Sequence, residues 1–304
     1  MLKKHQIENC RIIDGLNGIG TIWVYISPNE QEKKYLIDDL KIDEHTLASA
    51  LDPDELSRLE FEPDHAALIF KRPKNYSSQD ELLFKVSSVG IFLFKDRLIV
   101  VMPEETPLFE GKQFQRVASL NDLLLKLIYR SIFHYLEHLK IINMITDSLE
   151  DKISSSMENK YLLNLFTLEK SLVYYLNAIN SNSMLIEKLK TSAAKIGFSP
   201  EGLEFLDDII IENNQCYRQA EIYSNILASM MDARASIVSN NLNVLMKTLN
   251  IITIGIMVPT FVVSAFSMNV GIPFSWHPSA FWMVMGLALV SVVAFMLFWR
   301  FKKW

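Results

Sequence analysis

Polar and sulfur-bearing side chains recur at steps of three and four residues along one apolar stretch near the C-terminus. That spacing keeps side chains on one face of an α-helix, so the pattern predicts a polar stripe. In hydrocarbon, amides and hydroxyls need a partner or water, so the stripe faces either neighbouring helices or an aqueous pore. Hydrogen-bonded helix packing and ion passage therefore both stay open. The stripe comprises Asn243, Met246, Asn250, Thr253, Met257, Thr260, Ser264 and Ser267.

Two long apolar segments carry this stripe and the residues after it. Residues 248–267 and 280–299 each match the roughly 30 Å hydrocarbon core of a membrane when wound as helices. The loop between them, 268–279, has no acid, lysine or arginine, and the formal charges after Lys247 are Arg300, Lys302 and Lys303. The positive-inside rule therefore predicts a membrane hairpin with both ends in the cytosol. Because two spans cannot enclose a pore, a pore would need a ring of copies.

Composition indicates an acidic cytosolic part before the spans. The chain has 304 residues and a net charge of −5, and before the spans 27 basic residues stand against 35 acidic ones, a net charge of −8. An acidic domain is a poor binder of nucleic acid and a plausible concentrator of divalent cations. Cys10 and Cys216 form no CxxC pair, so we expect free thiols. The N-terminus MLKKHQIENC lacks the apolar core of a cleavable signal peptide.

The first hundred residues predict an α+β fold, a mixed sheet covered by helices on at least one side. β-Branched and aromatic runs indicate strands at 21–27, 66–72, 82–88 and 89–101. Helical spacing indicates helices at 29–40 and 46–59, with Asp52-Pro53 as a helix start. Residues 121–157, 161–191 and those after Pro200 predict long helices packed antiparallel.

The last of these helices leads into the polar stripe. No proline occurs between Pro200 and Pro259, so about 65 residues of helix would extend on the order of 100 Å. A helix of that length would either carry a conformational change from the cytosolic part to a pore or serve as a passive stalk.

The segment NNLNVLMKTLNIITIGIMVPTFVVSAFSMNVGIPF, the second span and the basic ending RFKKW resemble the CorA family of magnesium channels. LASALDPDELSRLEFEPDHAALIF and SSVGIFLFKDRLIVVMPEE resemble the cytosolic funnel domain of that family, so the resemblance covers nearly the whole chain. It implies a homopentamer in a lipid bilayer whose first helices line the pore and whose second helices face lipid. The implied activity is gradient-driven passage of Mg²⁺, with Co²⁺ and Ni²⁺ as further candidates and cytosolic Mg²⁺ feedback. No enzyme activity and no organic cofactor are implied.

The resemblance also implies a domain layout. A cytosolic α/β domain occupies 1–120 and long antiparallel cytosolic helices occupy 121–199. A stalk helix at 200–267 continues into the pore-lining span, and a periplasmic or extracellular loop at 268–279 joins it to the second span at 280–299. A basic cytosolic tail follows at 300–304. We expect a multi-pass protein of the inner cell membrane with both termini in the cytoplasm.

The family signature at the outer mouth is Gly-Met-Asn, which here reads Ser267-Met268-Asn269. In the family the Asn oxygens hold a still-hydrated cation, which suits Mg²⁺ because it releases its waters reluctantly. Ser in place of Gly requires a backbone conformation compatible with a Cβ. The loop residues 272–274 carry no acid, where relatives often have a Glu.

Carried inward, the resemblance assigns the stripe to the lining of the family's pore. Met246, Leu249 and Met257 would form apolar rings that gate by dewetting. Asn243 and Thr260 would offer oxygens to hydrated ions. The absence of a carboxylate in the span favours passage of a divalent ion over storage. The predicted lining is completed by Asn250, Thr253 and Ser264.

The resemblance further implies a regulatory metal site. In family members, Mg²⁺ at acidic sites between subunits holds the closed state. Counting back from Asn243 places one such acid at Asp208, with Asp80 as a candidate partner. A solvated acid on a helix face is the plainer interpretation of either residue.

Three other interpretations stay open. His134-Tyr135-Leu136-Glu137-His138 fits H-x-x-E-H, which on a helix places two imidazoles one turn apart for zinc, with the Glu as the base of a zinc-dependent hydrolase. Glu212, far downstream, is the candidate third ligand. A zinc-transporting branch of the same superfamily also departs from Gly-Met-Asn at the outer mouth. A non-conducting, membrane-anchored helical scaffold would have lost a working entrance.

Overall fold

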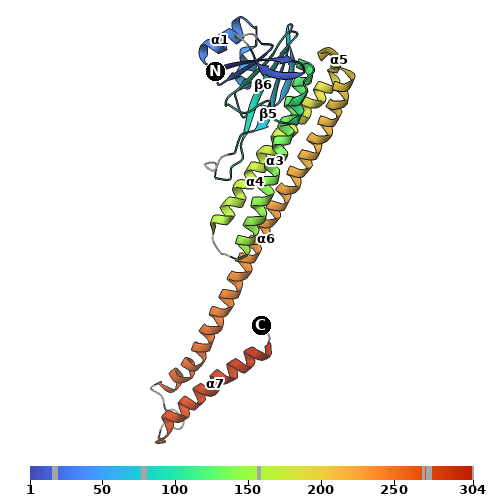
Figure 1. Cartoon of the computed structure of the whole chain (residues 1–304). Helices are drawn as coiled ribbons and strands as arrows, with labels where there is room; N and C mark the ends of the chain where they lie inside the picture. Colours follow the sequence, from blue (N-terminus) through green and yellow to red (C-terminus); the bar gives the residue numbers. More distant parts are fainter. Residues whose placement is uncertain (16–19, 77–80, 156–158, 269–270, 272–275, 303–304) are drawn as a thin grey trace. The chain divides into compact units, whose positions relative to one another are not determined.

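The structure is a computed structural model that describes residues 1–15, 20–76, 81–155, 159–268, 271 and 276–302. Figure 1 follows the chain from an N-terminal sheet into long helices. The chain divides into two compact units, Met1–Met231 and Asp232–Trp304, and the boundary falls inside one long helix.

The first unit is built on a mixed β-sheet. In the described residues the sheet has seven strands in the order β2-β1-β3-β7-β6-β5-β4. β3 and β7 are parallel, and the other neighbouring pairs are antiparallel. The strands are β1 (Leu2–Glu8), β2 (Arg11–Asp14), β3 (Ile22–Ile26), β4 (Arg58–Phe61), β5 (His65–Pro73), β6 (Val86–Phe94) and β7 (Leu98–Met102).

Helices pack on both faces of this sheet, and a later helix, Pro200–Phe266, continues into the second unit. The predicted helix at 29–40 is confirmed as α1, where Asn29 forms a capping box with Glu32. The long helices predicted at 121–157 and 161–191 are confirmed as α3 and α4. The helices are α1 (Glu30–Asp38), α2 (Glu44–Ser49), η3 (Lys112–Gln115), α3 (Leu120–Ser155), α4 (Asn159–Thr191), α5 (Ala193–Ile196), α6 (Pro200–Phe266) and α7 (Ala280–Lys302).

Each face of the sheet has its own apolar core. Successive residues of a strand point to opposite faces, so Leu98 and Val100 of β7 enter one core while Ile99 and Val101 enter the other. The first core is shared with α3 and α4, and the second with α1 and α2. The mixed sheet covered by helices is therefore confirmed, with helices on both sides.

Asn182 of α4 forms two hydrogen bonds with the backbone of β5 and so joins the helical layer to the sheet. Its Oδ1 accepts a hydrogen bond from the Lys71 backbone N–H at 2.8 Å, and its Nδ2 donates to the Lys71 carbonyl at 2.7 Å. β4 pairs with residues 66–69 of β5, so the amide of Asn182 takes the place of a neighbouring strand at Lys71. Each bond contributes about 1 kcal/mol, and a bare buried peptide group would cost more.

The first part of α6 packs with α3 and α4 in the first unit, as Figure 1 shows. Its buried residues follow one another at steps of three and four, which keeps them on one face. One of them is polar: Asn213 donates its Nδ2 to the Ile179 carbonyl of α4 at 3.3 Å. The buried face consists of Leu206, Ile209, Asn213, Cys216 and Ala220.

The predicted helix at 46–59 is wrong beyond Ser49. α2 ends there, and β4 begins at Arg58. Two buried donors of the sheet use backbone carbonyls of the intervening segment: Ser88 Oγ donates to Asp52 O, and Lys71 Nζ donates to Pro53 O at 2.7 Å. A helix through this segment would bond those carbonyls internally and leave the buried donors unpaired.

The predicted strand division between Ser88 and Val89 is also wrong. One strand, β6, runs through both residues, and the turn comes later, where the Phe94 N–H donates to Arg97 O at 2.9 Å. Charged residues make that turn, so no glycine or proline marks it. The hairpin of β1 and β2 was not predicted.

Candidate functional site

The second unit contains two helical stretches long and apolar enough to cross a membrane. They lie in the C-terminal part of α6 and in α7. In the single chain, 0 % of the apolar window of α6 and 6 % of that of α7 is buried. An apolar surface of this extent belongs in lipid or against other protein.

The polar stripe lies on an exposed face of α6. All eight of its residues are exposed in the single chain. The exposed fractions are 61 % for Met246 and 63 % for Met257, and Leu249 beside the stripe is 64 % exposed. Within one chain, therefore, the predicted lining residues are gathered on one face and are not packed away.

A different face of α6 is half-buried. At about 100° per residue, its mean direction differs from that of the stripe by about 170°. The two sets thus occupy opposite sides of the same helix. Between residues 248 and 266 the half-buried set is Ile251, Gly255, Val258, Pro259, Val262 and Phe266.

α7 packs on this second face. A Cβ built on Gly255 would lie 3.7 Å from Cε1 of Phe295, which is van der Waals contact. The more buried residues of α7 also recur at steps of three and four, and Ala288 among them is 6 % exposed. Small residues at such positions let two helices approach closely. The buried face of α7 consists of Ala280, Val284, Ala288, Ser291, Val292 and Phe295.

Gly255 was missed by the sequence analysis, although a local signal exists. Pro259 has no N–H to donate to the carbonyl one turn earlier, which belongs to Gly255. A small residue such as glycine inside an apolar helix indicates a place where another helix can come close. Both residues are on the face that α7 covers.

The threonine hydroxyls of the stripe use their protons within the helix. Thr253 Oγ1 donates to Leu249 O at 2.8 Å, and Thr260 Oγ1 donates to Ile256 O at 2.7 Å. A hydroxyl has one proton and two lone pairs, so each oxygen keeps acceptor capacity. These oxygens can accept hydrogen bonds from water, including the waters around a cation.

Ser267 closes the C-terminal end of α6. Its backbone N–H and its Oγ both reach Ser264 O, at 3.1 and 2.8 Å. Ser267 is not among the described non-glycine residues with positive φ, so its Cβ is accommodated without left-handed backbone. The neighbouring Met268 is 58 % exposed. Asn269 and residues 272–274 lie outside the described residues.

Asp208 lies on the exposed side of α6 in the first unit. The adjacent Asp207 pairs with Lys190 at 2.8 Å. Burial raises the pKa of Tyr129 on α3, and the negative charges of Glu212 and Asp208 raise it further. Asp80 lies outside the described residues. Within one chain, the part that the structure describes has no group of three or more His, Cys, Asp or Glu that could hold a metal ion.

The H-x-x-E-H pattern on α3 is a packing element, and its interpretation as a zinc centre is wrong for the described residues. His138 is buried, and its Nδ1 lies 2.5 Å from the Tyr175 hydroxyl. Burial lowers the pKa of His134 to about 3 and that of His138 to about 4. Glu137 Oε2 forms an ion pair with Arg130 Nη1, at 3.1 Å.

The chain is similar to known proteins. A family model described as CorA-like Mg²⁺ transporter protein matches residues 20–303. The cobalt/magnesium transport protein CorA of Methanocaldococcus jannaschii is 25% identical over 299 residues, which cover 93% of this chain and 91% of that protein.

Two solved structures are also similar to this chain. The complete structure of the CorA magnesium transporter from Methanocaldococcus jannaschii matches 98% of this chain and 96% of its own, with a TM-score of 0.83 and 22% identity. The ZntB cytoplasmic domain from Vibrio parahaemolyticus matches 78% of this chain and 98% of its own, with a TM-score of 0.61 and 15% identity. Both likenesses are likenesses of fold.

Proposed function

Because the chain belongs to the family of CorA-like Mg²⁺ transporter proteins, we propose that it conducts Mg²⁺ through a pore on the axis of a homopentamer. Divalent cation transport, and not enzyme activity, is the function of this family. Mg²⁺ is then cargo, and no organic cofactor is needed. Co²⁺, named for the relative from Methanocaldococcus jannaschii, and Ni²⁺ are the further candidate ions.

One observation supports the pore most directly: Phe295 of α7 contacts Gly255 on the half-buried face of α6, opposite the polar stripe. A stripe that glued α6 to its own partner helix would lie under α7. The exposed stripe instead needs water or other copies of the chain, because polar groups in hydrocarbon require partners. In a ring of five copies the stripes would meet around the axis, with α7 on the lipid side.

The side chains of the stripe suit an ion that keeps its water shell. Mg²⁺ prefers octahedral oxygen coordination and loses water reluctantly. Rings of amide and hydroxyl oxygens, from residues such as Asn243, Thr253 and Thr260, can accept hydrogen bonds from those waters. Between them, rings of Met246, Leu249 and Met257 would interrupt the water column and gate by dewetting.

The outer mouth of the pore is assigned to Ser267, Met268 and Asn269. Five Asn269 amides would hold one hydrated ion on the pore axis, at the outer mouth, by hydrogen bonds to the waters of the ion. The hydrogen bonds from Ser267 to Ser264 O support the proposal that the C-terminal end of α6 keeps its conformation with serine at the position where the family has glycine.

We also propose that Mg²⁺ regulates the channel from the cytosol. Asp208 is exposed, as it must be if its carboxylate meets an acid of a neighbouring subunit, for which Asp80 is the candidate. Bound Mg²⁺ would screen the repulsion between the acids and hold the closed state. Release of Mg²⁺ would favour the open state and complete a feedback loop.

The proposed location is the inner cell membrane, with two spans and both termini in the cytoplasm. Lys247 lies just before the first span and Arg300 just after the second, at the ends away from the connecting loop. This distribution of charge supports the proposed orientation. Entry of a divalent cation would be driven by its gradient and by the membrane potential, at about 2.3 kcal/mol per charge for each 100 mV.

Uptake by the purified protein in liposomes tests the function. We expect a homopentamer by native mass spectrometry and an inward flux of Mg²⁺ that a negative internal potential accelerates. Faster uptake of Zn²⁺ than of Mg²⁺ would favour the zinc transporter instead. No uptake by the parent, with uptake regained in Ser267→Gly, would favour a scaffold that has lost conduction.

A further inference from the structure

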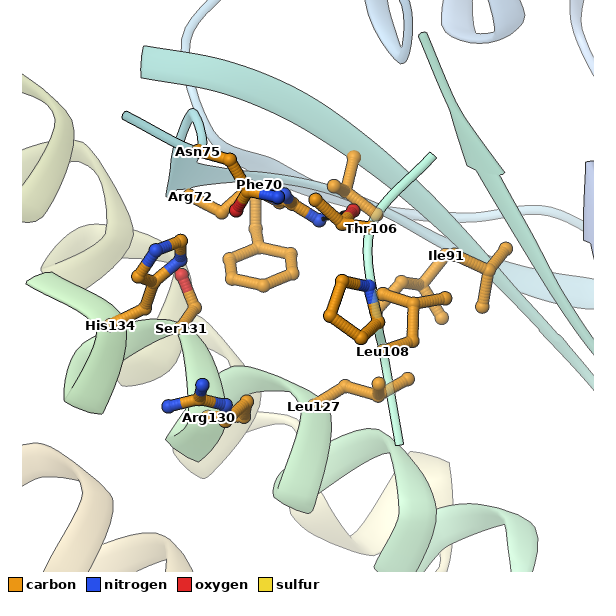
Figure 2. Close-up of a pocket in the computed structure, with 13 residues that line it drawn as sticks. Phe70, Arg72, Asn75, Ile91, Thr106, Leu108, Leu127, Arg130, Ser131 and His134 are labelled. Atoms are coloured by element: carbon orange, nitrogen blue, oxygen red, sulfur yellow. Dashed lines mark hydrogen bonds between the residues drawn. The ribbon is translucent and has the colours of Figure 1, made fainter. Parts of the chain in front are cut away.

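A small cavity lies between the sheet and α3 in the first unit, and the proposed transport does not use it. Its volume is about 80 Å³. β5, β6, β7, the segment 106–108 and one face of α3 contribute its walls (Figure 2). The lining includes Arg72, Ile91, Leu108, Leu127, Arg130 and His134.

The lining is divided into a cationic side and an apolar side. Figure 2 shows Arg72, Asn75 and His134 toward one side of the cavity, with Arg130 below, while Ile91, Leu108 and Leu127 lie on the other side. The described lining residues include two arginines and no Asp or Glu.

Arg72 is the buried anchor of the cationic side. It is only 7 % exposed, and its guanidinium donates to Thr106 Oγ1 and to Pro73 O. Burial lowers the pKa of Arg72, and the positive charge of Arg130 lowers it further, against the opposing effect of Glu104. Glu104 itself pairs with Lys74, at 3.1 Å. The hydrogen bonds of Arg72 thus go to neutral oxygens, while the charge of Glu104 offsets part of the cost of burying the guanidinium.

Arg130 and His134 both line the cavity from α3. Burial lowers the pKa of His134 most, followed by the charge of His138 and then by the positive charges of Arg72 and Arg130. His134, Arg72 and Arg130 are therefore close enough to repel one another when charged. Arg130 is held at its exposed end by Glu137, at 3.1 Å. An anion in the cavity would relieve the repulsion between the two guanidinium groups.

We propose that this cavity binds a small organic carboxylate, with its oxygens on Arg72 and Arg130 and its hydrocarbon group against Ile91, Leu108 and Leu127. Arginine is suited to this because its planar fork of donors matches a carboxylate. A water molecule takes up roughly 10–15 Å³ of such a cavity, so about six non-hydrogen atoms fit, the size of isobutyrate. An inorganic oxyanion has no hydrocarbon group to pack against the apolar wall, so the cavity disfavours it.

Calorimetric titration of the detergent-solubilised full-length protein with sodium isobutyrate, at ionic strength fixed with chloride, tests the proposal. We expect saturable binding at one site per chain. Arg130→Gln should weaken it by about tenfold or more, because a charge-assisted hydrogen bond is lost. Glu137→Gln should tighten it, because Arg130 is then released from its ion pair. Leu127→Phe should abolish it by filling the cavity without changing charge.

Arg97→Gln is the matched control, since it removes one guanidinium that pairs with Asp96 and lies outside the lining. Its affinity for isobutyrate should equal that of the parent. Circular dichroism establishes that each variant is folded. Absence of saturable binding, or equal binding by the parent, Arg130→Gln and folded Leu127→Phe, would overturn the site. Inorganic phosphate binding as tightly as isobutyrate would overturn the assigned ligand class.

Discussion

Phe295 of α7 lies against Gly255 of α6, with its Cε1 3.7 Å from the place where a Cβ on Gly255 would stand. This contact fixes which side of α6 its partner helix takes. The polar stripe is on the other side, and the half-buried residues of α6 surround Gly255. The proposed path for ions depends on this division of one helix into a covered face and an open face.

A large side chain at Gly255 should separate the two helices, whereas a methyl group should not. Gly255→Ala adds a methyl group at ordinary contact distance, so we expect an unchanged melting temperature or a small increase from better helix propensity. Gly255→Leu overpacks the contact and should destabilise the protein by about 1–3 kcal/mol. Thermal unfolding in detergent measures both. Equal melting temperatures for the Leu and Ala variants would contradict close packing at this position.

Asn269→Ala should abolish Mg²⁺ uptake. The substitution removes the amide that, by the proposed assignment, accepts hydrogen bonds from the waters of the entering ion. Growth of a transport-deficient strain at low Mg²⁺ provides the measurement, with Asn269→Gln as the variant that keeps an amide. Full rescue by the Ala variant, at equal membrane expression, would remove Asn269 from the outer mouth.

Asp208→Ala should leave the channel active at cytosolic Mg²⁺ concentrations that close the parent. Loss of the carboxylate removes a ligand of the proposed regulatory ion, so the inhibition curve should shift to higher Mg²⁺. Uptake into liposomes preloaded with graded Mg²⁺ measures that curve. Asp207→Ala is the matched control, since Asp207 already pairs with Lys190. An unshifted curve for Asp208→Ala would refute the sensor role.

The buried histidines of α3 should make the fold sensitive to acid. Their pKa values are lowered to about 3 for His134 and about 4 for His138, below the unfolded value of 6.5. Below pH 6.5 the unfolded state therefore binds more protons than the folded state does. The contribution of the two neutral histidines to stability is complete above pH 6.5 and is lost as the pH falls toward 4. The limiting slope is about 1.4 kcal/mol per histidine for each pH unit.

Thermal unfolding between pH 8 and pH 4.5, followed by circular dichroism, tests this dependence. The parent should lose melting temperature as the pH falls through about 6. A double variant, His134→Gln with His138→Gln, should give a flatter profile even though its stability at neutral pH is lower. Parallel profiles would show that the acid sensitivity has another source.

Much of the long-helix architecture could be predicted because its signals are local. Length and apolar content identify the spans, and the absence of proline before Pro259 predicts the continuity of α6. The helix expected at 46–59 failed because distant residues decide its conformation: Lys71 and Ser88 bond the carbonyls of Pro53 and Asp52. Local propensity does not contain that information.

The hairpin of β1 and β2 was missed for a similar reason. LKKHQIE has only two apolar residues and no strict alternation, so β1, which lies between β2 and β3, carries a weak strand signal. Its turn uses Asn9 and Cys10, with φ of 51° and 59°, and cysteine is an unusual residue for such a turn.

The candidate site was predictable only in part. Spacing alone places the stripe residues on one face of α6. Spacing does not say which face the partner helix covers, because α7 is apolar on every side and offers no polar pattern to match. The arginines of the cavity come from β5 and α3, which are far apart in sequence, so no motif joins Arg72 to Arg130.

A pore on the axis of the pentamer requires that the polar stripe meets water while the Gly255 face of α6 meets protein. Cysteine substitution tests it most directly, in a background where Cys10 and Cys216 are replaced. Met257→Cys and Thr260→Cys are compared with Val258→Cys and Val262→Cys, which lie at similar depth on the covered face. We predict that Cd²⁺, added to proteoliposomes, blocks Mg²⁺ uptake in the first pair and leaves the second pair unaffected. Block of the second pair with sparing of the first would contradict the account.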